Sequence, residues 1–309
     1  MTIHRNFIGC DIAKTAIDLF DRGTGKASHL ANDPATLAAF AAGLDPARDI
    51  VVMEATGSAD RLLRHVLAAR AIACVRVNPT MARRFAQARG RLAKTDRIDA
   101  RSLAELGALF QPDADPPPDP ERERLAALAR RRDQLVDARA VERRHLHEAF
   151  DPIVIADIEA ALAALDIRIT RIESEIKAQA DGMAGATAEI ERLVTAPGVG
   201  PVTALTLLAH MPELGQLSPK AAASLAGLAP MNDDSGSRKG KRRIRGGRPR
   251  VRRALYMAAL GAVRASTRLR TFYTALAARA ASKKLALIAV ARKLLTILNA
   301  MVRDKTEYS

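Results

Sequence analysis

Five of the ten residues from Gln111 to Pro120 are proline, and this density indicates a boundary between two separately folded parts of the chain. Proline fixes its own φ and has no backbone N–H, so neither a helix interior nor a central strand tolerates such a run. We therefore expect a semi-rigid extended linker over residues 112–120, a first domain over 1–111, and further domains from 121 onward.

Before the linker, short β-branched or apolar runs alternate with helical segments. The strand-like runs are Phe7–Ile12, Ala16–Phe20, Ala27–Leu30, Ile50–Met53 and Ile72–Val77. Helices are expected from Pro34 to about Leu44, with Asp33 as the cap, from Arg61 to Arg70, and over the segment that contains Asp96 and Asp99. A hairpin followed by strand–helix crossovers predicts an α/β domain with a mixed sheet and helices on its faces.

Four carboxylates are placed where such a sheet collects its functional groups. Asp11 ends the first strand, Glu54 follows the fourth, and Asp96 and Asp99 lie three residues apart on one helix face. Converging carboxylates repel one another, and a hard divalent cation such as Mg²⁺ or Mn²⁺ relieves that repulsion. Two such ions can clamp the attacking and leaving oxygens of a phosphodiester. For Asp96 and Asp99 alone, a solvated acidic pair bridged to neighbouring arginines is the alternative.

Residues 121–186 have the pattern of a helical hairpin. After a break at Asp151-Pro152, apolar residues repeat every three or four positions, at Ile158, Leu162, Leu165, Ile169, Ile172 and Ile176. This seam packs either within the chain or against a second copy. We favour a homo-oligomer, a dimer or tetramer, formed through this coiled coil.

Residues 187–309 form a mostly helical C-terminal domain that begins with a helix-hairpin-helix pattern. Ile190–Thr195 and Pro201–Met211 are helical, and Gly198 and Gly200 lie in the turn between them. Two glycines let a phosphate approach the backbone N–H groups of the following helix. An ordinary helical turn is the alternative reading.

A basic segment dominates the charge of the chain, which holds 49 Lys and Arg against 34 Asp and Glu, a net charge of +15. Ten of the sixteen residues from Arg238 to Arg253 are basic, and no acidic residue occurs between Arg238 and Arg303. This surplus indicates a nucleic-acid partner. The residues expected to bind it are Arg238, Lys239, Lys241, Arg242, Arg243, Arg245, Arg248, Arg250, Arg252 and Arg253.

Ser235 precedes this basic segment, beside Gly236 in a polar loop. A serine in that position is a candidate nucleophile, because arginines would neutralise the charge that develops on an attacked phosphate. An ordinary loop serine is the alternative.

Composition limits the other possibilities. Aromatic residues make up only 3% of the chain and Trp is absent, so stacking on bases is not the main mode of binding. Cys10 and Cys74 fall in apolar runs, as expected of buried thiols in a reducing compartment. We find no run of eighteen apolar residues and no signal peptide, and expect a cytoplasmic bacterial protein that has no membrane partner.

Three short motifs resemble those of the DEDD insertion-sequence transposases, a family that includes the Piv/MooV-type DNA invertases. They are Ile8–Lys14, Met53–Gly57 and Lys94–Ala100. Four later segments resemble the C-terminal domain of that family, namely Pro197–Gly200, Gly227–Pro230, Ser235–Gly236 and Gly246–Arg252. The resemblance covers nearly the full chain in the right order.

The resemblance implies an RNase H-like first domain of the kind found in Holliday-junction resolvases, with Asp11, Glu54, Asp96 and Asp99 as its metal-binding tetrad. It also implies a catalytic serine at Ser235, with Ser237 close enough to be the alternative. Family members act as recombinases that an RNA from the element's non-coding end guides to donor and target DNA. The mechanism expected from the resemblance is attack of the serine on a DNA phosphodiester, assisted by the bound metal, with retention of the strand as a phosphoserine.

Other readings stay open at this point. The carboxylates could activate water in a junction nuclease, or the chain could be a DNA invertase without a guide RNA. Asp11–Thr15 also resembles the first phosphate loop of sugar-kinase-like ATPases, although no second phosphate loop follows. The non-enzymatic reading is a basic nucleic-acid-binding protein with a decayed tetrad.

Overall fold

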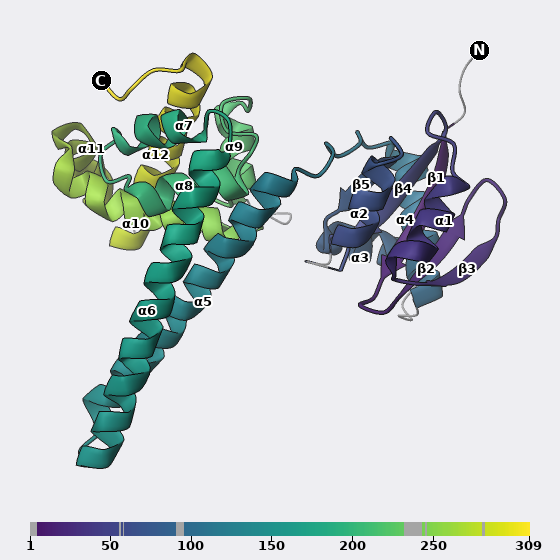
Figure 1. Cartoon of the computed structure of the whole chain (residues 1–309). Helices are drawn as coiled ribbons and strands as arrows, with labels where there is room; N and C mark the ends of the chain where they lie inside the picture. Colours follow the sequence, from purple (N-terminus) through teal and green to yellow (C-terminus); the bar gives the residue numbers. More distant parts are fainter. Residues whose placement is uncertain are drawn as a thin grey trace. The chain divides into compact units, whose positions relative to one another are not determined.

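The computed structural model describes residues 5–55, 57, 59–90, 96–231, 243–244, 246–279 and 282–309, except for the side chains of residues 96–98, 231 and 243. It divides into two compact units, Met1–Asp119 and Pro120–Ser309, each with its own set of elements (Figure 1). The division falls at the end of the proline-rich segment.

The first unit contains a five-stranded mixed sheet in the order β3-β2-β1-β4-β5. Strand β1 is antiparallel to β2 and parallel to β4, and β4 is parallel to β5. The strands are β1 (Asn6–Ile12), β2 (Ala16–Asp21), β3 (Ala27–Ala31), β4 (Asp49–Glu54) and β5 (Ala73–Val77). This arrangement confirms the predicted α/β domain and fits the RNase H-like fold that the resemblance implies.

The helices of this unit are α1 (Pro34–Ala42), α2 (Arg61–Ala68), α3 (Pro79–Ala88) and α4 (Asp96–Phe110). The Asp33 side chain accepts the backbone N–H of Thr36 at 3.0 Å, which confirms the predicted cap of α1. Helix α3 was not predicted. It begins after an Asn78 cap with Pro79 at its first position, and none of its residues is fully buried.

Two apolar layers cover the sheet. On one face, Ile8, Cys10 and Met53 pack with Leu37 of α1 and Leu63 of α2. On the other face, alternate residues of the same strands pack with Leu103 and Leu106 of α4, and Phe85 of α3 joins them; these strand residues are Phe7, Ile50, Val52, Val75 and Val77. Because strand side chains alternate between faces, the two layers fix which face each remaining strand residue occupies.

The proline-rich segment has neither helix nor strand, as predicted, but it is attached to the sheet at Asp115. The backbone N–H of Asp115 donates to the carbonyl of Cys74 at 2.8 Å. Its carboxylate accepts from the backbone N–H of Arg76 at 3.2 Å and from Nε of Arg76 at 2.8 Å. The segment therefore follows the edge strand β5 before the second unit begins.

The second unit starts with two long helices, α5 (Pro120–Glu148) and α6 (Pro152–Gly182), which form the hairpin visible in Figure 1. Ion pairs join the two helices along their length, including Arg132 with Glu173 at 2.6 Å. Of the predicted seam, Ile158, Ile169 and Ile176 are buried. The other seam residues, Leu162, Leu165 and Ile172, are partly buried, and the homo-oligomer expected through this coiled coil stays a prediction.

The rest of the unit is a helical bundle with a two-stranded ribbon. Its elements are α7 (Ala186–Val194), α8 (Pro201–His210), α9 (Pro219–Leu225), β6 (Pro230–Met231), β7 (Arg243–Ile244), α10 (Pro249–Ala265), α11 (Thr267–Ala277) and α12 (Lys283–Asp304). Its core includes Leu207, Leu255, Leu294 and Leu298, all fully buried. Helix α11 was not predicted.

Among the described residues, one helix is long and apolar enough to cross a membrane by length and composition alone, namely α12. Half of its apolar window is buried inside the unit. Leu294 and Leu298 of this helix lie in the core with residues from α8 and α10. Such burial is typical of the central helix of a globular bundle.

Candidate active site

Asp11 and Glu54 lie on one face of the sheet, at the carboxyl ends of adjacent parallel strands. The last matched pair of β1 and β4 is Cys10 with Met53, and Asp11 and Glu54 are the next residue on each strand. Cys10 and Met53 pack in the layer with α1 and α2. By alternation, Asp11 and Glu54 belong to the opposite face, which α4 covers, and both are partly buried.

Helix α4 packs directly on β1 because Gly9 has no side chain. A Cβ at Gly9 would lie 1.8 Å from the carbonyl oxygen of Ala100 and 2.6 Å from the amide nitrogen of Ala104. Gly9 precedes Asp11 by two residues and so shares its face. Asp99 immediately precedes Ala100, so this close contact fixes the backbone that carries Asp99 beside the strand that carries Asp11.

The fourth predicted carboxylate, Asp96, is the first residue of α4, and its side chain lies outside the described residues. Among the side chains that the structure describes, no three His, Cys, Asp or Glu residues lie close enough to hold a metal ion. The structure thus brings Asp11 and Glu54 to one face, with the backbone of Asp99 beside them. A complete metal cluster would need Asp96 as well.

The candidate nucleophile belongs to the segment between β6 and β7. These strands pair antiparallel, Pro230 with Ile244 and Met231 with Arg243, and residues 232–242 connect them. The following predicted residues lie outside the described part of the chain, wholly or in their side chains: Ser235, Ser237, Arg238, Lys239, Lys241, Arg242, Arg243 and Arg245. Their roles stay predictions.

Arg252 joins the two ends of that segment. Its Nη1 donates to the carbonyl of Gly246 at 2.9 Å and to the carbonyl of Gly227 at 3.3 Å. Gly227 precedes β6 and Gly246 follows β7. Arg252 was predicted to bind nucleic acid, and in the described structure its guanidinium holds the base of the segment that contains Ser235.

Arg248 is held by Glu213. The guanidinium makes two hydrogen bonds of 2.6 Å to the two carboxylate oxygens and a third, of 2.9 Å, to the carbonyl of His210. Burial alone would raise the pKa of Glu213, but the hydrogen bonds from Arg248 bring the pKa below its usual value. A two-pronged contact of this kind is among the strongest side-chain hydrogen bonds, so Glu213 holds the Arg248 guanidinium in place, and nucleic-acid binding by Arg248 stays a prediction.

Two further arginines at the start of α10 pair with the hairpin helix α5. Arg250 forms an ion pair with Asp133, and Nη2 of Arg253 lies 2.9 Å from Asp137. The hydrogen bond from Arg253 lowers the pKa of Asp137. The Arg253 side chain is still 67% exposed, so it can also approach a phosphate from solvent.

His210 is enclosed by the same arginines. Burial lowers the pKa of its imidazole to about 4, and the positive charges of Arg250, Arg130 and Arg248 act in the same direction. Its Nε2 is buried and has no hydrogen-bond partner among the described residues. His210 is therefore neutral at pH 7 and contributes no positive charge to this basic region.

The two glycines of the predicted phosphate-binding turn differ in their surroundings. A Cβ at Gly198, where φ is +76°, would lie 2.3 Å from both the carbonyl of Ala258 and the amide of Ala262 on α10. Gly198 thus allows the turn between α7 and α8 to pack on α10. Gly200 is the residue before α8, and open space surrounds its Cβ position. Gly198 is exposed and Gly200 is partly exposed, so phosphate binding at this turn stays a prediction.

Comparison with protein families agrees with these features. The family described as Transposase IS116/IS110/IS902 matches residues 190–274, and the DEDD transposases of the IS110 type match residues 8–155. The chain belongs to the IS110-type DEDD transposases. The two matches extend over both compact units of this transposase.

Individual relatives are similar over different lengths. An insertion element IS110 protein of 43.6 kDa from Streptomyces coelicolor is 32% identical over 200 residues, which cover 60% of this chain and 48% of that protein. The pilin gene-inverting proteins of Moraxella bovis and Moraxella lacunata are each 28% identical over 262 residues, 84% of this chain and 81% of theirs. The chain thus spans about half of the Streptomyces protein and about four fifths of the Moraxella proteins.

The structure of this transposase adds one carboxylate that the sequence analysis missed. Asp18 on β2 lies directly opposite Asp11 in the sheet, so both residues share the face that α4 covers. Its Oδ1 is 3.0 Å from Nδ1 of His29 on β3. Burial raises the pKa of the neighbouring Cys10 thiol well above its usual value, and the charges of Asp11 and Asp18 raise it further. In the sequence, Asp18 stands out only as a polar residue within a strand whose residues alternate between the two faces of the sheet.

The donor set fits a hard divalent cation. Asp11, Glu54 and Asp99 offer only carboxylate oxygens, which Mg²⁺ and Mn²⁺ prefer. The softer ligands Cys10 and Cys74 are buried in the opposite layer, with α1 and α2. The residues of this face therefore suit magnesium better than zinc.

Proposed function

We propose that this transposase cuts and rejoins DNA strands as the recombinase of an insertion sequence. The observation that supports this most is the position of Asp11 and Glu54 at adjacent strand ends on the face that α4 covers. The names of the relatives point the same way, since one belongs to an insertion element and two invert a pilin gene.

Asp11, Glu54, Asp96 and Asp99 would hold Mg²⁺ or Mn²⁺ in this proposal. When bound, such an ion stabilises the charge that develops on a reacting phosphate and makes a hydroxyl a better nucleophile. The contribution of the chain is to place acidic oxygens at the ends of β1 and β4 and at the start of α4. The packing of Gly9 on Ala100 keeps these elements in register.

Ser235 would be the nucleophile. Its Oγ attacks the phosphorus of a DNA phosphodiester and loses its proton, a bond from Oγ to phosphorus forms, and the bond to one sugar oxygen breaks. That sugar leaves as a hydroxyl. The reverse attack by a sugar hydroxyl of another strand releases Ser235 and joins the strands, so no external energy source is needed.

The nucleic-acid partners in this proposal are donor and target DNA and a structured guide RNA. The net charge of +15 and the absence of acidic residues between Arg238 and Arg303 support a large phosphate contact. The guide RNA rests on the family resemblance alone. The protein would act on DNA in the bacterial cytoplasm, as a homo-oligomer.

The decisive experiment is a strand-exchange assay on DNA that carries the element ends, with Mg²⁺ present. Wild-type protein should form a covalent protein–DNA adduct that Ser235→Ala abolishes and the neighbouring Ser237→Ala retains. Asp11→Asn should also abolish the adduct while DNA binding persists. If Ser235→Ala still forms the adduct, the nucleophile assignment is wrong.

Two outcomes would select the other readings. Mg²⁺-dependent cleavage without any adduct would indicate a metal-dependent junction nuclease that uses water. Tight binding without cleavage would indicate a non-catalytic nucleic-acid-binding protein. For the guide, the assay is repeated with and without RNA transcribed from the non-coding end; equal exchange in both would exclude RNA guidance.

A further inference from the structure

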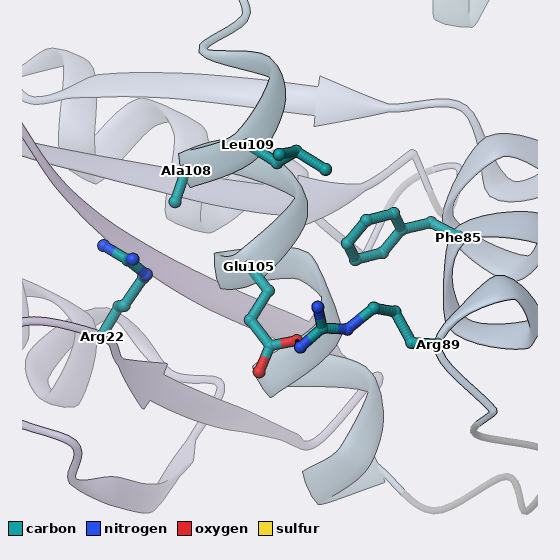
Figure 2. A pocket seen from close by; sticks show the side chains of 6 residues that line it. All are labelled: Arg22, Phe85, Arg89, Glu105, Ala108 and Leu109. Atoms are coloured by element: carbon teal, nitrogen blue, oxygen red, sulfur yellow. Dashed lines mark ion pairs between the residues drawn. The ribbon is translucent and has the colours of Figure 1, made fainter.

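A pocket of about 350 Å³ lies between α3 and α4 of the first unit, towards the carboxyl end of α4 (Figure 2). It is lined by Arg22, Phe85, Arg89, Glu105, Ala108 and Leu109. Helix α4 rises about 1.5 Å per residue, so its lining residues Glu105 and Leu109 lie roughly 9 Å and roughly 15 Å along it from Asp99. The pocket is therefore separate from the carboxylate site and has no part in the proposed chemistry.

Exposed apolar side chains surround this pocket. Phe85 and Phe110 are in edge-to-face contact, with ring centroids 6.2 Å apart and planes at 69°. Leu109, which lines the pocket, is 68% exposed, and Phe110 is 58% exposed. A contiguous apolar patch of this kind on a water-soluble surface marks an interaction site.

The rim of the pocket is positively charged. Arg22 and Arg89 lie on either side of Glu105 (Figure 2). The carboxylate of Glu105 is 3.2 Å from both Arg89 and Arg101, so its charge is offset. Helix α3 carries Arg83 and Arg84 besides, and no acidic residue. An occupant should therefore combine an apolar group with negative charge.

The tip of the α5–α6 hairpin has this combination. Phe150 is 92% exposed and Ile153 is 81% exposed. From Glu148 to Asp157 the charged residues are Glu148, Asp151 and Asp157, and all three are acidic. At the tip, the Asp151 carboxylate caps α6 by accepting the backbone N–H groups of Ile153 at 2.9 Å and Val154 at 3.2 Å. The tip thus presents two exposed apolar side chains beside carboxylates.

We propose that the hairpin tip of one copy of this chain docks into the α3–α4 pocket of a second copy. Phe150 would enter the apolar part of the pocket, and Glu148 would approach Arg22 and Arg89 on its rim. An aromatic anchor in a pocket, surrounded by complementary charges, is the usual core of a specific interface. The proposal does not depend on the proposed chemistry.

The hairpin itself supports a contact at its tip. Three residues of its seam, Ile158, Ile169 and Ile176, are buried within the chain, whereas the tip carries the most exposed large apolar side chains of the hairpin. Each copy carries both a tip and a pocket. Surfaces that complement each other within one sequence in this way are typical of symmetric dimers.

Disulfide trapping tests the contact directly in the full-length protein. Leu109→Cys and Phe150→Cys are purified separately, mixed and mildly oxidised; the native Cys10 and Cys74 are buried and do not compete. A covalent dimer should form in the mixture much faster than in either variant alone. The matched control is Ile167→Cys with Leu109→Cys, because Ile167 is 71% exposed but lies roughly 25 Å along α6 from the tip.

Three results would overturn the proposal. Equal trapping by Ile167→Cys would indicate random collision. Faster trapping of Phe150→Cys with itself would indicate a tip-to-tip contact. Trapping only within one chain, in a highly diluted double variant, would show that the tip does not belong to a second copy.

A charge exchange gives an independent test by analytical ultracentrifugation. Arg89→Glu and Glu148→Lys should each weaken self-association about tenfold, and the double variant should restore it. Arg22→Glu repeats the test on the other side of the pocket, and circular dichroism checks that each variant folds. If Arg89→Glu weakens nucleic-acid binding but leaves self-association unchanged, the pocket binds nucleic acid and the proposal fails.

Discussion

Gly9 on β1 and Ala100 on α4 lie so close together that any side chain at Gly9 would overlap the backbone of the helix. A Cβ placed there would be 1.8 Å from the carbonyl oxygen of Ala100. The contact occurs two residues before Asp11 and one residue after Asp99. It thus links the geometry of the candidate metal site to the packing of a helix on a strand.

Substitution of Gly9 by Ala should therefore disturb the site without changing any charged residue. Relief of the overlap requires α4 to move away from β1, and such overpacking costs about 1–3 kcal/mol of stability. We expect metal-dependent DNA cleavage to fall strongly, as measured with purified protein and labelled DNA. The control is Gly43→Ala, where the nearest heavy atom to the new Cβ is 3.5 Å away. Normal cleavage by Gly9→Ala would contradict the role of this contact.

Asp18→Asn tests the carboxylate that faces Asp11 across the sheet. Removal of its negative charge should weaken attraction of a divalent cation, and loss of a residue that supports metal ligands typically costs about tenfold in affinity. We expect a rise of about that size in the Mg²⁺ concentration for half-maximal cleavage. His29→Ala, which keeps the carboxylate, should have a smaller effect. An unchanged Mg²⁺ dependence in Asp18→Asn would show that Asp18 does not act on the site.

Substitutions of the basic residues at the start of α10 should have two kinds of effect, one on stability and one on nucleic-acid binding. Arg248→Ala breaks the bidentate contact to the partly buried Glu213 and should cost about 1–3 kcal/mol of unfolding free energy. Arg253 is largely exposed, so Arg253→Ala should instead lower the slope of log affinity against log salt by about one. Urea unfolding and binding titrations at several salt concentrations measure the two effects. A reduced salt slope in Arg248→Ala would place Arg248 on the nucleic acid.

Local signals in the sequence predicted much of the fold. The cap at Asp33 was predicted because a capping side chain and the helix that it stabilises are adjacent in sequence, and the break at Asp151-Pro152 is likewise a helix start, capped by Asp151. The strands β1 and β4 were predictable because buried β-branched runs are unmistakable, and with them the places of Asp11 and Glu54. Helix α3 was missed although Asn78 before Pro79 is a helix start signal, because its short apolar face, Ala82 and Phe85, is interrupted by Arg83 and Arg84.

The partners of the arginines were not predictable, because they are distant in sequence. Arg250 pairs with Asp133, 117 residues earlier, and Arg248 pairs with Glu213, 35 residues earlier. A run of basic residues indicates a nucleic-acid surface when read alone. The tertiary structure shows that some of these charges also form ion pairs between α10, α5 and the segment after α8.

The final prediction concerns His210 and pH. The pKa of this imidazole is about 4 in the folded protein, against 6.5 for an ordinary histidine, because it is buried among arginines. As the pH falls below 6.5, His210 is therefore protonated in the unfolded chain, whereas in the folded unit it stays neutral down to about pH 4. The folded state loses stability as the pH falls through this window. Between pH 7 and 5 we expect a loss of about 1–2 kcal/mol.

This loss can be measured on the second unit alone. The chain has no Trp, and its three tyrosines, Tyr256, Tyr273 and Tyr308, all lie after Pro120, so tyrosine fluorescence during urea unfolding reports this unit. Although burial opposes them, hydrogen bonds from Arg248 lower the pKa of the neighbouring Glu213, whereas burial raises the pKa of Glu189, so Glu189→Gln serves as a second control over pH 5–7. His210→Asn, which cannot take up the proton in either state, should flatten the pH dependence. An identical slope in wild type and His210→Asn would assign the loss to other groups.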